Sequence, residues 1–217
     1  MTDETPVIPE LNRRMLLRGG LVAGAGLAVA GLGTFGLSKA AEAVTFDTQP
    51  YWAFCHNCAV LWYTKNNTNG VCTYALGHGG TGHAKSPSYS YGMWYNVSGT
   101  GGPTHQPGWN WCSACQCLFY AANGNAVESV CPATAYFGGP HKTGGFAYSM
   151  LYNDGVDGST QGNWWWCGAC QALFNSNAGD GSCPAPNGGG PHVAGQTHPT
   201  IIKSLAYDVS YYSTSSP

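Results

Sequence analysis

A framework of three cysteines and one histidine occurs three times along the chain, and it constrains the fold more than any other feature. Each copy begins with Cys-x2-Cys, continues to a third cysteine after 12 to 15 further residues and ends at a histidine nine to eleven positions later. The first cysteines of successive copies lie 57 and 55 residues apart. A fixed period of this kind indicates a repeat architecture, so we expect each copy to be one structural unit. The three sets are Cys55, Cys58, Cys72 and His83; Cys112, Cys115, Cys131 and His141; and Cys167, Cys170, Cys183 and His192.

The residues around each Cys-x2-Cys motif also repeat, and they indicate β-strands. An aromatic residue stands one and three positions before the first cysteine, and a leucine followed by an aromatic stands three and four positions after the second. Aromatic residues at alternate positions fit the two-residue period of a strand, and Gly, Pro, Asn and Ser clusters separate these segments. No window has the spacing of an amphipathic helix. We predict an all-β fold of three tandem pseudo-symmetric units of about 56 residues.

The unit boundaries follow from the repeat. We place the units at residues 44–103, 104–158 and 159–217. A similar segment follows each histidine and none precedes Trp52, so the copy at residues 205–208 is surplus at the C-terminus. A surplus strand can close against the first unit and remove open sheet edges. The units therefore form either a closed pseudo-threefold β structure or three modules in a row, and we favour closure by the C-terminal strand.

The Cys/His framework predicts metal sites. A Cys-x2-Cys turn holds two thiolates at the spacing that one tetrahedral ion needs, and a distant Cys and His complete a closed Cys3His shell. We expect up to three ions, with Zn2+ as the default and iron as the alternative, since iron–sulfur clusters also accept mixed Cys and His ligands. A disulfide framework is the competing interpretation, because the chain has ten cysteines and exported proteins are often oxidised. Three cysteines per unit cannot all pair within symmetric units, which favours metal.

Four residues of this framework are ambiguous. His78 and His83 both follow Cys72, and the Gly-Gly-x-Gly-His spacing favours His83. His56 lies inside the first Cys-x2-Cys motif without a counterpart elsewhere, so we interpret it as a solvated turn residue. Cys117 is the tenth cysteine and aligns with small apolar residues of the other units, so we expect a buried free thiol.

Residues 1–43 resemble a bacterial twin-arginine (Tat) export signal. Arg13 and Arg14 precede an apolar stretch from Gly19 to about Leu37, and Ala41-Glu42-Ala43 supplies a small-x-small cleavage site. A general secretory signal or a signal anchor is the alternative. Tat cargo folds in the reducing cytoplasm, where metal can bind before export. We expect an extracellular, periplasmic or cell-surface protein.

The low charge of the chain excludes some classes of function. Charged residues make up 8% of the sequence, and after signal cleavage four lysines, no arginine and six acids remain. Such a chain lacks the basic face that nucleic-acid binding requires. The part after residue 43 has no second apolar run long enough to span a membrane. The low charge of the chain is also compatible with self-association.

The sequence contains few groupings of residues that are typical of an active site, so it favours a function other than catalysis. Glu128 is the only glutamate after residue 43, and Asp154 and Asp157 lie in a turn-like Asn-Asp-Gly-Val-Asp-Gly segment. A glycosidase needs two facing carboxylates, and nothing pairs these acids. A full Cys3His shell has no open position for a substrate. An exported metalloenzyme or redox protein remains the alternative function.

The repeat resembles tandem modules of secreted actinobacterial and soil-bacterial proteins, which have a pattern like W-x-W-C-x2-C-x2-L-F-Y…C-P-A-G-G-x-H. The resemblance covers residues 52–208 and departs in the first unit at Ala59-Val60 and Thr73. It implies shared roles for the Cys and His residues but no particular activity.

A binding function fits the aromatic content best. Eight tryptophans and 13 tyrosines exceed what a small core needs, and aromatic faces stack on sugar rings. We predict a cell-surface or extracellular binding module, with polysaccharide or cell-wall glycan as the first guess. A structural subunit of an extracellular assembly is the further alternative. The candidate ligand contacts are Trp94, Trp165, Tyr211 and Tyr212.

Overall fold

The computed structural model describes most of the chain after the predicted export signal, and that signal lies outside the described residues. All described residues belong to the compact unit that spans Ala40–Pro217. None of their helices is long and apolar enough to cross a membrane. The described residues are 45–78, 80, 82–87, 89–98, 104–122, 129–134, 139–152, 160–185, 190–194 and 205–213.

The described part of the chain is almost all β. It contains nine strands, one five-residue α-helix and a short 3-10 helix, and every strand pairing is antiparallel. The elements are β1 (Thr45–Phe54), β2 (Leu61–Tyr63), α1 (Thr73–Gly77), β3 (Tyr89–Ser98), β4 (His105–Cys112), β5 (Leu118–Tyr120), β6 (Thr143–Tyr152), β7 (Thr160–Trp166), β8 (Leu173–Asn175), η5 (Ser176–Ala178) and β9 (Ala206–Ser213).

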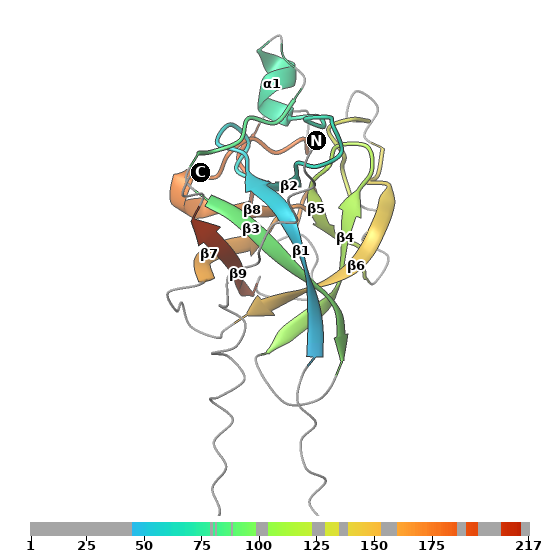
Figure 1. The fold of residues 1–217 in the computed structure, drawn as a ribbon. Helices are drawn as coiled ribbons and strands as arrows, with labels where there is room; N and C mark the ends of the chain where they lie inside the picture. The colour runs from blue at the N-terminus through green and yellow to red at the C-terminus, as the bar shows by residue number, and fades with distance from the viewer. Residues whose placement is uncertain are drawn as a thin grey trace, which may run out of the picture. The chain divides into compact units, whose positions relative to one another are not determined.

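The three units share one order of strands: long, short, long. In each unit the first long strand pairs with both the short strand and the second long strand. The second long strands β3, β6 and β9 pair with one another in all three combinations. The result is a near-closed antiparallel barrel with three repeated units, as the sequence predicts (Figure 1).

The C-terminal strand closes the barrel, but it is not a surplus strand. β9 pairs with β3 of the first unit from Tyr89↔Ser213 to Gly92↔Ser210. β1 already begins at Thr45, so the first unit has its own long strand before and through Trp52. Each unit therefore contributes the same three strands, and closure follows from the pseudo-threefold symmetry rather than from an offset between the chain ends.

A β-bulge bends each first long strand directly before its buried tryptophan. The pairing register shifts at this point in β1, β4 and β7. The residue before the tryptophan has a positive φ in all three: Tyr51 at 75°, Gly108 at 96° and Asn163 at 63°. Bulges of this kind increase the local twist, which helps a sheet of few strands to close.

One end of the molecule is an aromatic core, here called the barrel core. A Trp, a Leu, a Tyr and a Met or Val from each unit fill it, and every one is almost fully buried. Tyrosine hydroxyls donate to glutamines of the preceding unit, which links the units into a ring. Its members are Trp52, Leu61, Tyr91 and Met93; Trp109, Leu118, Tyr148 and Met150; and Trp164, Leu173, Tyr207 and Val209. The ring pairs are Tyr91 to Gln161 (2.7 Å), Tyr148 to Gln49 (2.5 Å) and Tyr207 to Gln106 (2.6 Å).

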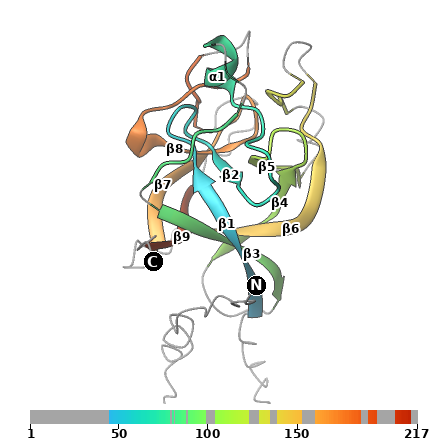
Figure 2. The ribbon, with the colours of Figure 1, turned by 45° about the horizontal axis from the view of Figure 1, so that its top comes forward.

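The other end is a second buried cluster, here called the knuckle layer. It contains all ten cysteines, together with Val60, Trp62, Phe119, Ala172 and Phe174 as its main apolar members. The short strands β2, β5 and β8 contact one another at this end, below α1 (Figure 2). They belong to both layers, because successive side chains of a strand point to opposite faces. Leu61 of β2 thus enters the barrel core, while Trp62 enters the knuckle layer.

The first unit differs from the others after its third cysteine. α1 occupies Thr73–Gly77, directly after the third cysteine, where the second and third units continue with Pro-Ala. In the first unit Leu76 N donates to Cys72 O at 3.1 Å, the helical bond that starts α1. The sequence gives no amphipathic signal for α1, because five residues are too few to show one.

Candidate metal centres

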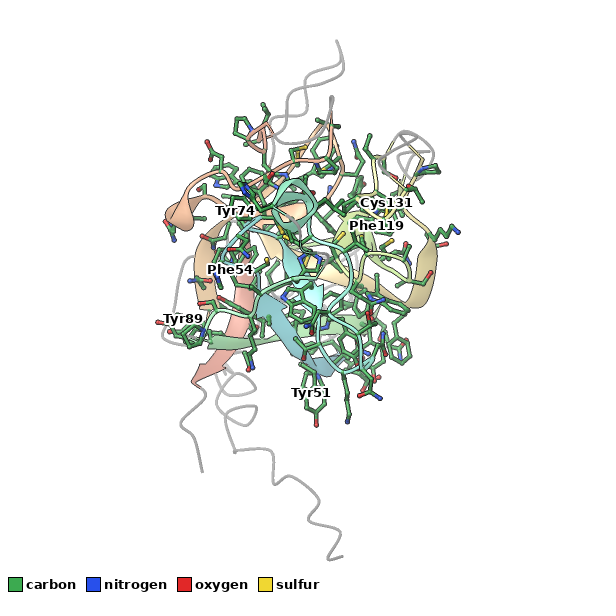
Figure 3. All side chains as sticks on the ribbon, turned by 90° about the horizontal axis from the view of Figure 1, so that it is seen from above. Tyr51, Phe54, Tyr74, Tyr89, Phe119 and Cys131 are labelled. Atoms are coloured by element: carbon green, nitrogen blue, oxygen red, sulfur yellow. The ribbon has the colours of Figure 1, made fainter. Side chains whose placement is uncertain are left out.

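The structure brings the twelve predicted residues together as three separate groups of four. Within each group the three Sγ atoms and one imidazole nitrogen all lie within 4.8 Å of one another, and all twelve side chains are buried. His83 belongs to the first group, whereas His78 is exposed and stacks on Tyr74 with ring centroids 4.2 Å apart. His56 is an exposed turn residue, as predicted. Figure 3 labels Cys131 of the second group and Phe119, which belong to the same buried cluster.

The spacing within each group fits a tetrahedral ion. Zn–S and Zn–N bonds of about 2.3 and 2.05 Å give tetrahedral edges of about 3.8 Å between sulfurs and about 3.5 Å between sulfur and nitrogen. The first and third cysteines of the groups are 3.8–3.9 Å apart at Sγ, and the second cysteine is 3.4–3.5 Å from His Nδ1. A disulfide requires about 2.05 Å, and all ten cysteines are free thiols.

A left-handed residue shapes each Cys-x2-Cys knuckle. It follows the second cysteine and has a φ of 63° at Ala59, 70° at Gln116 and 69° at Gln171. This conformation returns the chain, so that Ala59 N donates to Cys55 O at 2.8 Å, with the same bond in the other units. The two glutamines add a side-chain bond across the knuckle, which Ala59 cannot make.

Two glycines that the sequence analysis missed allow the third cysteines to approach. Gly70 and Gly181 each stand two positions before a third cysteine and have φ values of 63° and 61°. A Cβ on Gly70 would lie 2.3 Å from Cys115 O, and one on Gly181 would lie 2.3 Å from Cys58 O. No other residue fits there, because a Cβ never comes so close to a backbone oxygen. The Gly-x-Cys spacing in the first and third units is the signal that could have found them.

The electrostatics of each group favour a bound cation. Hydrogen bonds from Cys58 and Cys72 lower the pKa of Cys55 far below its ordinary value, whereas burial raises the pKa of Cys58 well above it. The other groups show the same contrast between first and second cysteines. Burial alone would lower the pKa of His83, but hydrogen bonds and charge from Cys55 and Cys72 raise it to about 9. A metal ion would supply the positive charge that such buried thiolates require.

The second nitrogen of each histidine links its group to the next unit. Nδ1 faces the thiols, while Nε2 faces the carbonyl oxygen of the second knuckle cysteine one unit on. Because a carbonyl only accepts, Nε2 carries the proton and the Nδ1 lone pair is left for a metal. Each unit therefore supplies all four of its own donors, while the next unit orients its histidine. The pairs are His83 to Cys115 O (3.0 Å), His141 to Cys170 O (3.1 Å) and His192 to Cys58 O (3.0 Å).

An aromatic ring stacks on each of these histidines and fixes its orientation. The partner is the second residue of the short strand, and the rings lie at 18° to 26° to one another. The Leu-aromatic pair of the sequence therefore has one residue for each layer. The stacked pairs are Trp62 on His83 (5.3 Å between centroids), Phe119 on His141 (4.6 Å) and Phe174 on His192 (4.9 Å).

The candidate ligand-contact residues occupy different environments. Trp94 is buried, with 5% of its surface exposed, and stacks on Phe46 at 3.7 Å. Trp165 is half-buried, and its indole N–H donates to Ser176 Oγ at 3.0 Å. Tyr211 is half-buried against Tyr89. The side chain of Tyr212, and the acidic residues Glu128, Asp154 and Asp157, lie outside the described residues.

Fold and site together define a near-closed antiparallel barrel of three repeated units, each with a buried Cys3His group that could hold a metal ion. Comparison of the chain with protein-family models, curated proteins and solved structures gives no match. The resemblance to secreted bacterial modules therefore stays a prediction. The metal-site geometry carries the functional argument alone.

Proposed function

We propose that this chain is an exported, non-enzymatic binding module in which three structural zinc ions replace an aliphatic core. The observation that carries the proposal is the closed donor set of each buried group: three sulfurs and one nitrogen at tetrahedral spacing. Closed sets of this composition are typical of structural zinc, whereas catalytic zinc keeps a position for water or substrate. Thiolate-rich donors also favour zinc over hard cations such as Mg2+.

The surroundings of the groups support a structural role. The ligand side chains form their further hydrogen bonds with backbone groups, as in His141 Nε2 to Cys170 O and Lys142 N to Cys112 Sγ at 3.4 Å. Among the described residues, no carboxylate belongs to any of the three groups. The donor set of each group is therefore made of thiols and imidazole alone in the part of the chain that the structure covers.

Metal content tests this proposal first. We expect about three zinc ions per chain by plasma mass spectrometry on the full-length protein, and nine thiols that react only after chelation and denaturation. Iron in place of zinc would redirect the function toward electron transfer. Absence of both metal and releasable thiols would sink the structural-zinc proposal.

For the ligand, we favour a glycan bound at partly exposed aromatic pairs of the long strands, three of whose rings pack against the barrel core. Tyr89 packs on Tyr211 with centroids 4.5 Å apart, and Tyr95 stacks on Phe146 at 4.2 Å, with Phe146 44% exposed. Stacking on sugar rings uses such rigid aromatic faces. Buried Trp94 offers no comparable face, so the proposal rests on the pairs. Figure 3 shows Tyr89 at the left edge of the described part of the molecule.

A pull-down on cellulose, chitin and peptidoglycan tests the glycan proposal. The variant Phe146→Ala should weaken binding, since it removes the most exposed ring of the pairs. Tyr74→Ala is the matched control, because Tyr74 is equally exposed at 43% but lies on α1 and outside the pairs. Binding that is lost equally in both variants, or no binding to any of the three polymers, would overturn the glycan proposal and leave the metal proposal intact.

Export is tested separately from binding. If Arg13 and Arg14 direct Tat transport, changing both to lysine should trap the precursor in the cytoplasm. Secretion at the original level would show that another route carries the chain.

A further inference from the structure

The two aromatic pairs of the long strands occupy equivalent positions in the repeat. Wherever two of the strands β3, β6 and β9 pair, a tyrosine of the barrel core stands opposite a half-buried tyrosine of the other strand. The second ring of each aromatic pair stands two positions before that core tyrosine, and residues two apart along a strand lie on one face. The same strand geometry therefore produces both pairs. The opposed tyrosines are Tyr148↔Tyr95, Tyr91↔Tyr211 and Tyr207↔Tyr152, and the second rings are Phe146 and Tyr89.

The third pairing has the same framework but lacks one ring. Tyr152 stands opposite Tyr207, and the residue two positions before Tyr207 is Leu205. Tyr152 and Leu205 are half-buried and pack against the barrel core, as Tyr89 and Tyr95 do. Of the three equivalent positions, two therefore have an aromatic pair, and one has a tyrosine with a leucine.

The long strands that form these positions have almost no charge. Together β1, β3, β4, β6, β7 and β9 include two aspartates and no lysine or arginine. Asp208 is buried. Asp47 is exposed, stands opposite Tyr95 and accepts a hydrogen bond from Asn96 Nδ2 at 2.9 Å. The exposed charge that the long strands offer beside an aromatic pair is therefore negative.

A lysine from outside the strands approaches the other pair from the far side of β3. Lys85 Nζ donates to Ser90 Oγ at 3.4 Å, and Ser90 follows Tyr89 in the strand. Successive side chains of a strand point to opposite faces, so the ammonium group lies across the strand from the ring of Tyr89. This cation is therefore not placed to bind an acidic group that sits on the Tyr89–Tyr211 pair.

We infer that the chain is a bivalent binder of neutral polysaccharide, with one subsite at Tyr95 and Phe146 and the second at Tyr89 and Tyr211. This inference rests on the glycan part of the proposed function and does not involve the metal. A neutral chain of pyranose rings has repeated apolar faces for stacking and needs no opposite charge. An acidic polymer would meet the carboxylate of Asp47 and find no cation in the long strands.

Two subsites on one chain change the strength of binding to a polymer. When both subsites hold the same polymer surface, the combined affinity exceeds that of either alone by about 100- to 10,000-fold. Leucine at position 205 offers apolar contact but no flat ring, so we expect the third position to contribute little. Leu205 also shows that the fold accepts leucine at this point of the repeat, which makes leucine the conservative replacement for Tyr89 and Phe146.

Binding isotherms on insoluble cellulose and chitin, with the full-length chain, test the inference. Tyr89→Leu and Phe146→Leu each remove one subsite and copy Leu205. We expect each change to weaken binding by about 100-fold or more, and the double variant to show no retention. Soluble polygalacturonate, whose pyranose rings each have a carboxylate, is the acidic comparison and should not compete with the insoluble polymers.

Leu205→Tyr should complete the third position and strengthen binding by about tenfold or more. Leu205→Met, which keeps an apolar side chain of similar size without a ring, is the matched control. Circular dichroism establishes that each variant is folded, and Tyr211→Leu, which removes the other ring of the same pair, replaces Tyr89→Leu if that variant folds poorly.

Three results would each overturn the bivalent, neutral-glycan inference. They are unchanged affinity in Tyr89→Leu or Phe146→Leu, equal binding of Leu205→Tyr and Leu205→Met, and competition by polygalacturonate. Retention on peptidoglycan alone would also overturn it, while the glycan proposal itself would stand. No binding to cellulose, chitin or peptidoglycan would instead remove the glycan proposal, so the two failures are distinguishable.

Discussion

The knuckle layer and the barrel core have the same pseudo-threefold symmetry, but they are built from different kinds of side chain. Both contain three equivalent sets of side chains, and a ring of hydrogen bonds joins the units in each. The rings run in opposite directions: His83 donates to the following unit at Cys115, whereas Tyr148 donates to the preceding unit at Gln49. Each unit is therefore tied to both neighbours, once in each layer, which explains why the repeat closes.

The two layers differ in what stabilises them. Tryptophan, tyrosine, leucine and methionine fill the barrel core, and their apolar surface stabilises it through burial. The knuckle layer has cysteines where a core would have aliphatic residues, with Val60, small alanines and three aromatic rings between them. Under the structural-zinc proposal, ligated metal takes the place of the missing apolar contacts, as in other small domains. Because the short strands belong to both layers, loss of metal should unfold both together.

The largest effect should come from breaking one metal group. Cys131→Ser removes a ligand and leaves two buried thiols and a histidine without their ion. Since zinc contributes about 10–16 kcal/mol to the folding of small zinc domains, we expect a loss of several kcal/mol and a poor yield of folded chain. Thermal unfolding by circular dichroism and zinc content measure both. Cys117→Ala, which removes a cysteine outside the groups, is the control; a Cys131→Ser chain as stable as that control would contradict the structural role.

The next effect should come from breaking the histidine ring while keeping the metal. His141→Cys retains a closed donor set, because zinc sites made of four cysteines are also common. It removes the imidazole N–H that donates to Cys170 O, and an unsatisfied buried carbonyl costs about 1–3 kcal/mol. We therefore expect three zinc ions per chain with a lower melting temperature. Loss of zinc from the second group would show instead that histidine is needed as a ligand, and unchanged stability would show that the ring contributes nothing.

Breaking the ring of the barrel core should lower stability without any change in zinc content. Tyr148→Phe removes the hydroxyl that donates to Gln49, at a cost of about 1–2 kcal/mol. Tyr207→Phe is the matched comparison, because Gln106 keeps a second donor, Trp109 Nε1 at 3.2 Å. We expect the smaller loss in Tyr207→Phe. Denaturant unfolding checks the order, and the reverse order would show that the tyrosine ring does not control the stability of this layer.

The sequence predicts the chemistry of the knuckle layer better than the path of the chain. Ligand identity is local, since Cys-x2-Cys and a histidine shortly after a Gly-Gly pair recur in every unit, and so the grouping of all twelve residues could be predicted. Strand alternation likewise indicates that Trp52 and Leu61 face a core. The cross-unit bonds could not be predicted, because they join residues such as His192 and Cys58 that are far apart in sequence. Nor could α1, which is too short to have a period.

The smallest effect should come from making the first knuckle like the other two. Gln116 and Gln171 donate through Nε2 to the carbonyl two residues before the second cysteine, at 3.0 and 2.8 Å, whereas Ala59 has no side-chain donor. Ala59 lies beside Gly181 as Gln116 lies beside Gly70, so position 59 is the counterpart of the one that glutamine occupies in the second unit. One added hydrogen bond should stabilise the chain by about 0.5–1.5 kcal/mol, or a few degrees in melting temperature. Ala59→Leu, which adds bulk but no donor, is the control. A gain in Ala59→Gln alone would show that the glutamine bond stabilises the knuckle, and an equal gain in both would assign the effect to buried apolar surface.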